Sequence, residues 1–254
     1  MRLQDKVVVI TGAGAGMGRA MALRFVAEGA KVVAGDVAED RLVALAQEVE
    51  AAGGTLTTVA GDVSKRDDAE ALVRTAIERY GGLHALVNNA GVMDQFQGVA
   101  TVDDATWERL MAINLYGPMV TSRAAVRHMK EHGGGAIVNV ASVAGVGGGA
   151  AGAAYTASKH GLIGLTRNTA FVYAQQGIRC NAIIAGGVAT RIQETIDPAK
   201  IDQEAMAQLG KWHAAVPDQL QPEDIANLTL FLVSDEAKKI NGALVAADAG
   251  WTAA

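Results

Sequence analysis

The stretch "KVVVITGAGAGMGRA" at residues 6–20 decides the fold. Its first half is a run of β-branched residues, which is typical of a strand buried on both faces. Gly12, Gly16 and Gly18 follow in the pattern G-x-x-x-G-x-G, and a helical pattern opens directly after them. Glycine permits a sharp turn and a close backbone approach, and the amino end of the next helix attracts an anion. The stretch therefore predicts a strand, a turn and a helix that together bind a dinucleotide.

The alternation of strand and helix continues along the chain. Short strand patterns lie at 6–11, 31–36, 55–62, 83–88, 135–142, 178–186 and 243–248. Helical patterns lie near 17–29, 38–52, 66–80, 104–131, 153–176 and 222–234. Because parallel strands need crossover connections, this order predicts an α/β fold with a doubly wound sheet of about seven parallel strands and helices on both faces.

One segment breaks this rhythm. From about 188 to 217 the chain is polar, prone to helix and without a strand pattern, although it carries Met206, Leu209 and Trp212. Irregular connections of this length are usually functional, so we expect a substrate lid. No linker, charge block or repeat divides the chain elsewhere, and residues 1–254 are expected to form one dinucleotide-binding oxidoreductase domain.

Composition limits the partners. The net charge of −5 argues against a nucleic-acid surface, which needs clustered Lys and Arg. The single cysteine, Cys180, excludes an intrachain disulfide and fits a reducing compartment. The histidines are scattered, so no metal site is expected. The first residues lack a signal-peptide core and no apolar run reaches the ~18 residues that span a bilayer. We expect a cytoplasmic protein with no membrane partner.

Asp36 ends the second predicted strand and bears on the cofactor. A carboxylate at this place can accept hydrogen bonds from the adenosine ribose hydroxyls and repels the additional phosphate of NADP. The stretch "DVAE" (36–39) also fits a helix capping box, and both roles can hold. Neither the glycine loop nor Val37 and Ala38 offers a basic side chain to offset the repulsion. The sequence therefore favours NAD.

Polar residues end two further strands. Asp62 and Val63 follow the third strand, and "NNAG" (88–91) ends the fourth, at the edge where open α/β sheets bind ligands. Asp62 either caps a helix or contacts adenine, and the sequence leaves both open. Two adjacent asparagines after "ALV" are not expected in a core, so "NNAG" indicates a ligand-binding edge.

"YTASK" (155–159) places Tyr155 and Lys159 one turn apart on the same helix face. A free phenol has a pKa near ~10 and exchanges protons poorly at neutral pH. A neighbouring ammonium favours the phenolate, so we expect Lys159 to lower the pKa of Tyr155. The pair would then serve as proton donor and acceptor for an alcohol or carbonyl. Lys159 can also hold the nicotinamide ribose.

Two more polar residues extend this candidate site. Ser142 ends the fifth strand in "VNVAS", where its hydroxyl either orients a substrate oxygen or begins a loop. Asn114 in "MAINLYG" is a poor helix former inside a helical pattern. It indicates either a satisfied buried amide or part of a proton path. No G-x-S-x-G elbow supports a serine nucleophile instead.

Taken together, T-G-x-x-x-G-x-G, N-N-A-G, Asn114, Ser142 and Y-x-x-x-K resemble the classical short-chain dehydrogenase/reductase family, from about Leu3 to Trp251. The resemblance implies a Rossmann sheet of seven parallel strands and a homo-oligomer, with a tetramer favoured. It implies catalytic roles for Ser142, Tyr155 and Lys159, with Asn114 holding a water in the proton relay. The cofactor contacts that it implies are Gly12, Gly16, Met17, Asp36, Asp62, Val63, Asn89, Gly91, Tyr155, Lys159, Val188 and Thr190.

The chain departs from the family pattern after the sixth strand. The usual N-x-x-x-P-G has Ala185 in place of proline, with Gly186, Val188 and Thr190 retained. The loop loses some restriction of φ, which loosens the implied positioning of the nicotinamide carboxamide by Thr190.

The sequence predicts an NAD-dependent oxidoreductase that interconverts a secondary alcohol and a ketone. A 3-oxoacyl-carrier-protein reductase using NADPH is one alternative, against which Asp36 argues. A nucleotide-binding regulator without activity is the other, although such proteins tend to lose the tyrosine or lysine. The expected pocket is mainly apolar and suits a cyclic or bulky alcohol. Its candidate lining outside the lid is Met93, Gln95, Val143, Val146 and Gly187, with Trp212 on the lid.

Overall fold

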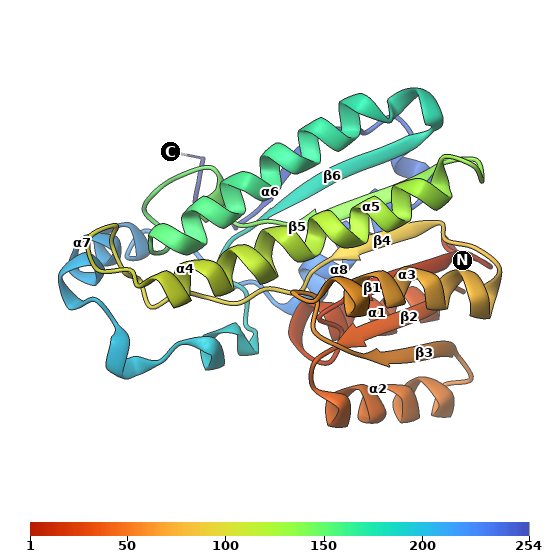
Figure 1. Ribbon diagram of the computed structural model, residues 1–254, viewed down its shortest axis with the longest axis horizontal. Helices are drawn as coiled ribbons and strands as arrows, with labels where there is room; N and C mark the ends of the chain where they lie inside the picture. Colours follow the sequence, from red (N-terminus) through yellow and green to blue (C-terminus); the bar gives the residue numbers. More distant parts are fainter. Residues whose placement is uncertain (254) are drawn as a thin grey trace.

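The computed structural model describes residues 1–253, which contain one seven-stranded sheet. The strand order is β3-β2-β1-β4-β5-β6-β7 and every pairing is parallel, which confirms the doubly wound fold. All carboxyl ends therefore lie at one edge, on the left in Figure 1. The strands are β1 (Val7–Thr11), β2 (Lys31–Asp36), β3 (Thr55–Ala60), β4 (Ala85–Asn88), β5 (Gly135–Val140), β6 (Ile178–Ala185) and β7 (Leu244–Ala247).

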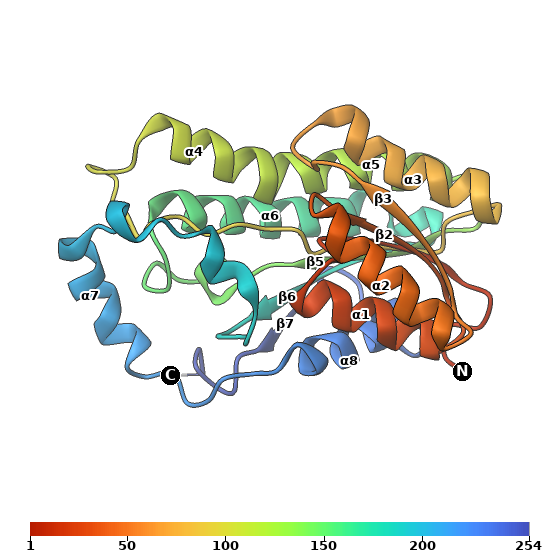
Figure 2. The ribbon, with the colours of Figure 1, turned by 90° about the horizontal axis from the view of Figure 1, so that it is seen from below.

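Helices cover both faces of the sheet (Figure 2). On one face lie α1 (Gly16–Ala27), α2 (Glu39–Ala51) and α8 (Pro222–Val233). On the other lie α3 (Arg66–Tyr80), α4 (Asp104–Met111), α5 (Gly117–Met129) and α6 (Ala153–Val172). Strand β1 shows why both layers form, because Val8 and Ile10 pack into the core below α1 while Val7 and Val9 pack toward α3 and α5.

The helix expected over 104–131 is confirmed as an unbroken helical stretch over 104–129, but its hydrogen-bond pattern changes in the middle. A π turn, Ala112–Tyr116, separates α4 from α5, and Asn114 lies in its middle. α5 continues directly from this turn and carries Pro118 among its first residues. Single π turns inside helices are common at functional sites, and this one carries a predicted catalytic residue.

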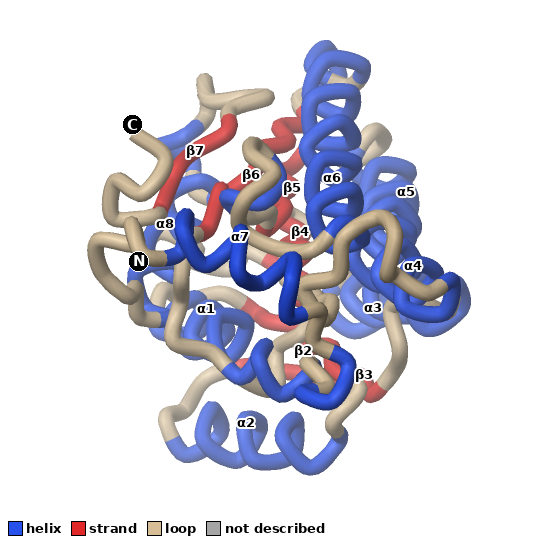
Figure 3. Tube along the Cα trace, turned by 90° about the vertical axis from the view of Figure 1, so that its left-hand side faces the viewer, coloured by secondary structure: helices blue, strands red, loops and turns tan. Residues whose placement is uncertain are grey.

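Residues 188–217 extend beyond the carboxyl edge of the sheet. They contain two 3₁₀ turns, Arg191–Thr195 and Pro198–Lys200, followed by α7 (Gln203–His213). Figure 3 looks at this edge and shows α7 in front of the strand ends. No residue of α7 is buried, and a bridge between Val188 and Leu220 returns the chain toward α8. Among residues 1–253 no helix has the length and hydropathy of a membrane span.

Candidate active site

Two adjoining cavities open at the carboxyl edge of the sheet. The first, of about 250 Å³, lies at the ends of β1 to β4, and the second, of about 540 Å³, lies between the ends of β4 to β6 and residues 188–217. Both are lined by Met17, Asn89, Gly91, Thr190 and Ile192, so they form one continuous cleft. Across residues 1–253 no cluster of three or more His, Cys, Asp or Glu side chains is arranged to hold a metal.

The glycine loop forms one wall of the first cavity. Gly12 and Gly16 adopt φ of +65° and +51°, which favours glycine. A Cβ on Gly18 would lie 2.1 Å from the carbonyl oxygen of Gly12, so this position also requires glycine. Helix α1 begins at Gly16 with no side-chain cap and no acidic residue in its first turn. Its first N–H groups lack partners within the helix, which fits the phosphates of a dinucleotide.

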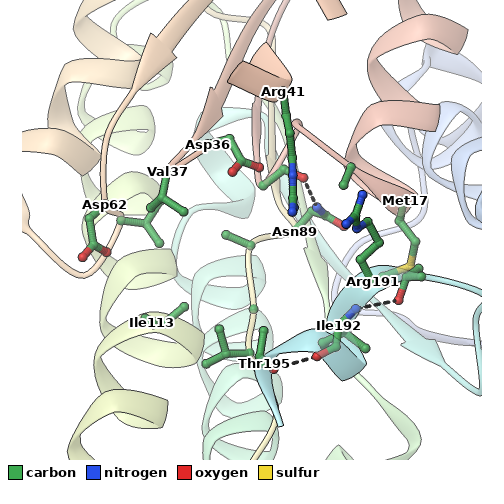
Figure 4. Close-up of a pocket in the computed structure, with 18 of the residues that line it drawn as sticks. Met17, Asp36, Val37, Arg41, Asp62, Asn89, Ile113, Arg191, Ile192 and Thr195 are labelled. Carbon is green, nitrogen blue, oxygen red and sulfur yellow. Dashed lines mark hydrogen bonds between the residues drawn. The ribbon is translucent and has the colours of Figure 1, made fainter. Parts of the chain in front are cut away.

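Asp36 lines the same cavity at the end of β2 (Figure 4). Its carboxylate accepts hydrogen bonds from the N–H groups of Gly14 at 2.8 Å and Ala38 at 2.9 Å. The capping-box alternative is wrong, because α2 begins at Glu39 behind Ala38 and has no side-chain cap. Asp36 therefore braces the loops around the cavity and leaves its carboxylate at the wall of the cavity.

The glycine loop, Val37 and Ala38 offer no basic side chain, as the sequence indicates, but two arginines from other segments line the cavity. Arg41 on α2 reaches the cavity wall beside Asp36, and Arg191, from the segment after β6, lines the same cavity (Figure 4). Sequence reasoning missed them because it considered only the glycine loop and the two residues after Asp36. Glu194 holds both guanidinium groups, at 3.5 Å from Arg41 and 2.6 Å from Arg191. This ion pair joins α2 to the segment after β6.

Asp62 and Val63 lie where the third strand ends, in the lining of the first cavity. The Asp62 carboxylate accepts the N–H of Ser64 at 2.9 Å. Helix α3 starts at Arg66 behind Lys65, so Asp62 is not its cap residue. The sequence left two roles open for Asp62. Capping of α3 is excluded, and a position at the ligand-binding edge remains.

The two asparagines of "NNAG" have different surroundings. Asn88 is only 2% exposed, contrary to the expectation that neither asparagine belongs to the core. Its amide N–H₂ donates to Ser122 at 3.0 Å and to the Asn139 amide oxygen at 2.8 Å, and its oxygen accepts from Thr121 at 2.6 Å. Because every polar group in this set has a partner, the amide can be buried between β4, β5 and α5.

Asn89 belongs to the cleft. Its N–H₂ group donates to the carbonyl oxygens of Thr11 and Gly12, both at 3.0 Å, which fixes the glycine loop. The amide oxygen is buried without a hydrogen-bond partner. Buried acceptors are normally satisfied, so this atom fits a bound ligand donor. Together with the uncapped amino end of α1 and the glycine loop, it shows that the first cavity suits a dinucleotide.

Tyr155 and Lys159 project from α6 into the second cavity and are 6% and 4% exposed. The Lys159 ammonium lies 5.5 Å from the centroid of the tyrosine ring, so the two groups share a helix face as expected. Lys159 donates to the carbonyl oxygen of Val140 at 2.9 Å. Ser142 lines the same cavity just beyond β5, and its hydroxyl accepts the N–H of Ala144 at 3.2 Å, so it both starts a turn and faces the cleft.

The electrostatics differ from the sequence-based expectation. Burial raises the pKa of Tyr155 to about 12, the Ser142 hydroxyl opposes this by hydrogen bonding, and the charge of Asp94 adds to it. Burial lowers the pKa of Lys159 to about 8. The prediction that Lys159 gives the tyrosine a low pKa is therefore wrong for the protein alone, because loss of water disfavours the charged phenolate and raises its pKa.

Asn114 lines neither cavity. It is fully buried, and its amide N–H₂ donates to the Val92 carbonyl at 3.0 Å and to the Ser158 hydroxyl at 3.2 Å. Its amide oxygen accepts the N–H of Val92 at 2.9 Å. A Cβ on Gly91 would lie 3.3 Å from that oxygen and 3.6 Å from the Lys159 ammonium nitrogen, so Asn114 supports the floor next to the lysine. The satisfied-amide alternative holds, and the proton path stays a prediction.

The predicted residues after β6 also reach the cleft. Val188 lines the second cavity and Thr190 lines both. The Thr190 hydroxyl accepts the N–H of Ile192 at 3.4 Å and begins the 3₁₀ turn that carries Glu194. Strand β6 runs through Ala185, which pairs with Ala247, so the strand stays regular where the family pattern has proline.

The substrate end of the cleft was predicted less well. Met93, Val143 and Gly187 line the second cavity, but Gln95, Val146 and Trp212 do not. Gln95 is buried, Val146 is 47% exposed, and Trp212 packs on Trp251 with 4.3 Å between ring centroids. From the expected lid, residues 188–217, Met206 and His213 line the cavity, whereas Phe96 and Trp251 are lining side chains that the sequence did not reveal.

A glycine-turn cleft that suits a dinucleotide, with a buried tyrosine, lysine and serine at its apolar end, defines a dinucleotide-dependent oxidoreductase. The family model described as short chain dehydrogenase matches residues 6–201, and the chain belongs to this family, whose members bind nicotinamide cofactors. A 3β-hydroxysteroid dehydrogenase of Eggerthella lenta is 42% identical over 252 residues, covering 99% of this chain and 96% of that protein. The short chain dehydrogenase adrF of Penicillium rubens is 40% identical, with 98% of both chains covered.

Solved structures agree with the fold. Levodione reductase superposes with a TM-score of 0.89 at 35% identity, with both chains fully covered. A short chain dehydrogenase from Mycobacterium paratuberculosis bound to NAD superposes with a TM-score of 0.91 at 31% identity, again over both whole chains. These findings support an enzyme of the alcohol and ketone oxidoreductase class.

Proposed function

We propose that this protein is an NAD-dependent oxidoreductase that interconverts a secondary alcohol and a ketone. The observation that carries the proposal is the second cavity, where Tyr155, Lys159 and Ser142 lie together at the junction with the dinucleotide-shaped first cavity. Such a junction brings a proton-exchanging group and a hydride-exchanging cofactor to one substrate carbon.

In this proposal Tyr155 takes the hydroxyl proton during oxidation and returns it during reduction. Ser142 donates to the substrate oxygen and orients it beside the phenol. Lys159, with a pKa of about 8, is mostly protonated at neutral pH, so its charge favours the phenolate against the effect of burial. When bound, the cofactor supplies the ring that accepts or returns hydride. Asn114 holds the floor beside Lys159, where the proton path to solvent is proposed to begin.

The preference for NAD rests on the carboxylate of Asp36 in the wall of the first cavity. A carboxylate there favours ribose hydroxyls and repels a ribose phosphate. Arg41 and Arg191 oppose this preference, because they share the single carboxylate of Glu194 and leave one net positive charge near the cavity. The proposed contacts are Gly12, Gly16, Met17, Asp36, Asp62, Val63, Asn89, Gly91, Tyr155, Lys159, Val188 and Thr190.

We also propose that residues 1–254 are one domain in which 188–217 act as a lid over the substrate. Exposed apolar side chains on α4 to α6 support a homo-oligomer, with a tetramer favoured. Trp107 is 40% exposed, Phe171 is 87% exposed and Val172 is 48% exposed. Sedimentation analysis of the purified protein tests this part, and a monomer at micromolar concentration would contradict it.

For the substrate we propose a bulky, apolar, cyclic alcohol or ketone. The second cavity of about 540 Å³ lies within the range of ligand sites and is lined mostly by apolar side chains. The relative named as a hydroxysteroid dehydrogenase supports this class, because a steroid nucleus is bulky, cyclic and apolar.

The test is a panel of secondary alcohols, including a 3β-hydroxysteroid and small polyols, assayed by reduction of NAD and of NADP. We expect turnover of the bulky alcohols with NAD. Turnover restricted to polyols would contradict the substrate class, and a preference for NADP would contradict the cofactor. Reduction of a 3-oxoacyl thioester with NADPH in the same panel would instead support the carrier-protein reductase alternative.

A further inference from the structure

Asp94 lies on the segment after β4. It is neither one of the proposed catalytic residues nor one of the proposed cofactor contacts. Its side chain is 0% exposed, and none of the ion pairs found within residues 1–253 includes it. Its carboxylate accepts three backbone N–H groups, from Tyr155 at 2.9 Å, Gly152 at 3.1 Å and Phe96 at 3.1 Å. Two of these donors belong to the first turn of the helix that carries the phenol.

The amino end of α6 explains how this carboxylate is stable without a cation. Helix α6 has 20 residues, Gly152 is its cap residue, and no side chain of its own caps it. The unpaired N–H groups and the helix dipole favour a negative charge at this place. A Cβ on Gly152 would lie 2.6 Å from an oxygen of Asp94, so glycine makes the close approach possible. Burial raises the pKa of Asp94, and the three N–H groups oppose that rise.

We propose that Asp94 is a positioning residue for Tyr155: its carboxylate fixes the first turn of α6 and places a negative charge at the backbone N–H of the residue whose phenol exchanges the substrate proton. The proposal deepens the proposed function and rests on Tyr155 being the acid and base. In this arrangement two charges of opposite sign have opposite effects on the ionisation of the phenol. Lys159 favours the phenolate, and Asp94 favours the phenol.

The other ionisable groups near the phenol are few. Lys159 is one turn further along α6, 5.5 Å from the ring centroid. His213 comes from α7 and lines the same cavity, where its Nε2 lies 3.0 Å from the carbonyl oxygen of Ala150. Apart from Tyr155 itself, no further titratable side chain among residues 1–253 lines this cavity. Asp94 lies behind this cavity wall, bound to the backbone N–H of Tyr155, and its charge adds to the larger effect of burial on the pKa of the phenol.

The test uses Asp94→Asn, which keeps the shape and one acceptor oxygen but removes the charge. The pH dependence of kcat for alcohol oxidation is measured for the wild type and the variant. We expect the acid limb of the Asp94→Asn profile, where oxidation rises as the phenol becomes able to accept a proton, to lie about one pH unit lower, because the phenol loses a nearby negative charge. The matched control is Asp103→Asn, an exposed carboxylate that caps α4 through the N–H of Thr106 at 2.7 Å. The acid limb of the Asp103→Asn profile is expected to lie at the same pH as that of the wild type.

A role in helix capping alone predicts a different result. In that case Asp94→Asn lowers thermal stability, or kcat at every pH, and leaves the limb where it is in the wild type. This outcome overturns the proposal. If Asp94→Asn is poorly folded, Asp94→Ser is used, since serine also accepts backbone N–H groups at a helix cap without carrying charge.

A second measurement separates this proposal from the proposed function. Ultraviolet difference titration follows phenolate formation without turnover, and Tyr155→Phe identifies the step of Tyr155 among the four tyrosines. We expect that step to move to lower pH in Asp94→Asn. A step that stays in place overturns the role of Asp94 even if the enzyme is active. Full activity of Tyr155→Phe, by contrast, overturns the proposed function and leaves the titration result standing.

Discussion

The two ends of the cleft differ in the groups that form them, which are mainly backbone at one end and side chains at the other. The dinucleotide end is made by backbone: three glycines of one loop, the amino end of α1, and carboxylates that brace N–H groups of the loops. The substrate end is made by side chains that come from α6 and α7 and from the segments after β4, β5, β6 and β7. The first end depends on a short continuous stretch, whereas the second depends on how distant segments fold together. Changes at one end should therefore leave the other end intact.

Tyr155→Phe should separate the two ends most completely. The variant keeps the ring that packs in the cavity and loses the hydroxyl, so kcat is expected to fall about a thousandfold. NAD binding, followed by quenching of protein fluorescence, should stay within about twofold of the wild type. Turnover near the wild-type rate would show that the substrate end does not exchange protons through this residue.

Lys159→Met tests whether the substrate end of the cleft buries the lysine away from water. The pKa of Lys159 is about 8 in the folded protein, against 10.5 for the free side chain. Between these values the unfolded chain binds a proton that the native protein does not, so wild-type stability rises with pH in this window. The methionine variant lacks this rise. The difference between its free energy of unfolding and that of the wild type should therefore change by about 2–3 kcal/mol in favour of the wild type between pH 7 and pH 10.5. Urea unfolding at several pH values measures this difference, and parallel curves for the two proteins would contradict a buried, weakly basic lysine.

Asp36→Ala tests the dinucleotide end alone. Loss of a charged hydrogen-bond acceptor is expected to raise KM for NAD about tenfold and to narrow the preference over NADP. KM for the alcohol should not change at saturating cofactor. Asp40→Ala, an exposed residue on α2, is the matched control. An unchanged ratio between the two cofactors would refute the ribose assignment.

Phe96→Ala tests the substrate end alone. The Phe96 ring lines the cavity and packs edge-on against His213, with ring centroids 6.0 Å apart. Its loss removes apolar contact area, so KM for a bulky alcohol should rise about fivefold while KM for NAD stays constant. Val99→Ala, in the same segment but 87% exposed, serves as control. A similar rise in KM for the alcohol and in KM for NAD would mean that the two ends of the cleft are not independent.

Glu194→Gln should have the smallest effect, because its ion pair with Arg41 is exposed. This pair connects the ends of the cleft, so its loss is expected to speed NAD release about twofold at low salt. The difference should vanish in high salt, where exposed charges are screened. Stopped-flow release at two salt concentrations measures it. Glu236→Gln, which breaks an ion pair with Arg2 at the opposite edge of the sheet, should leave release unchanged.

What the sequence predicted follows the same division. The glycine loop, Asp36 and the order of strands and helices could be predicted, because each depends on a local pattern of glycine, apolar period or strand end. Asn88 was misjudged because its partners, Ser122 and Asn139, lie in other elements. Arg41 was missed for a related reason, since a long side chain on the following helix reaches back over the strand end.

The substrate end was predicted only in part, because long-range contacts form it. Nothing in the sequence around Trp251 signals that its ring closes a cavity beside α7. The pKa of Tyr155 was misjudged because spacing shows the neighbouring charge but not the burial of both groups. Asp94 carried no motif at all, although an acid shortly after a strand end and before a distant helix cap becomes meaningful once the fold is known.

The absence of buried residues in α7 has a consequence for how this enzyme can change. Substitutions at exposed helix positions cost little stability, usually within about 0.5 kcal/mol. Residues 203–213 nevertheless lie over the cavity that holds the alcohol, and Met206 and His213 face it. A mutant library of α7 that keeps Trp212, which packs on Trp251, should therefore yield variants with new specificities while most of its members still fold, which makes α7 the natural starting point for directed evolution of the enzyme.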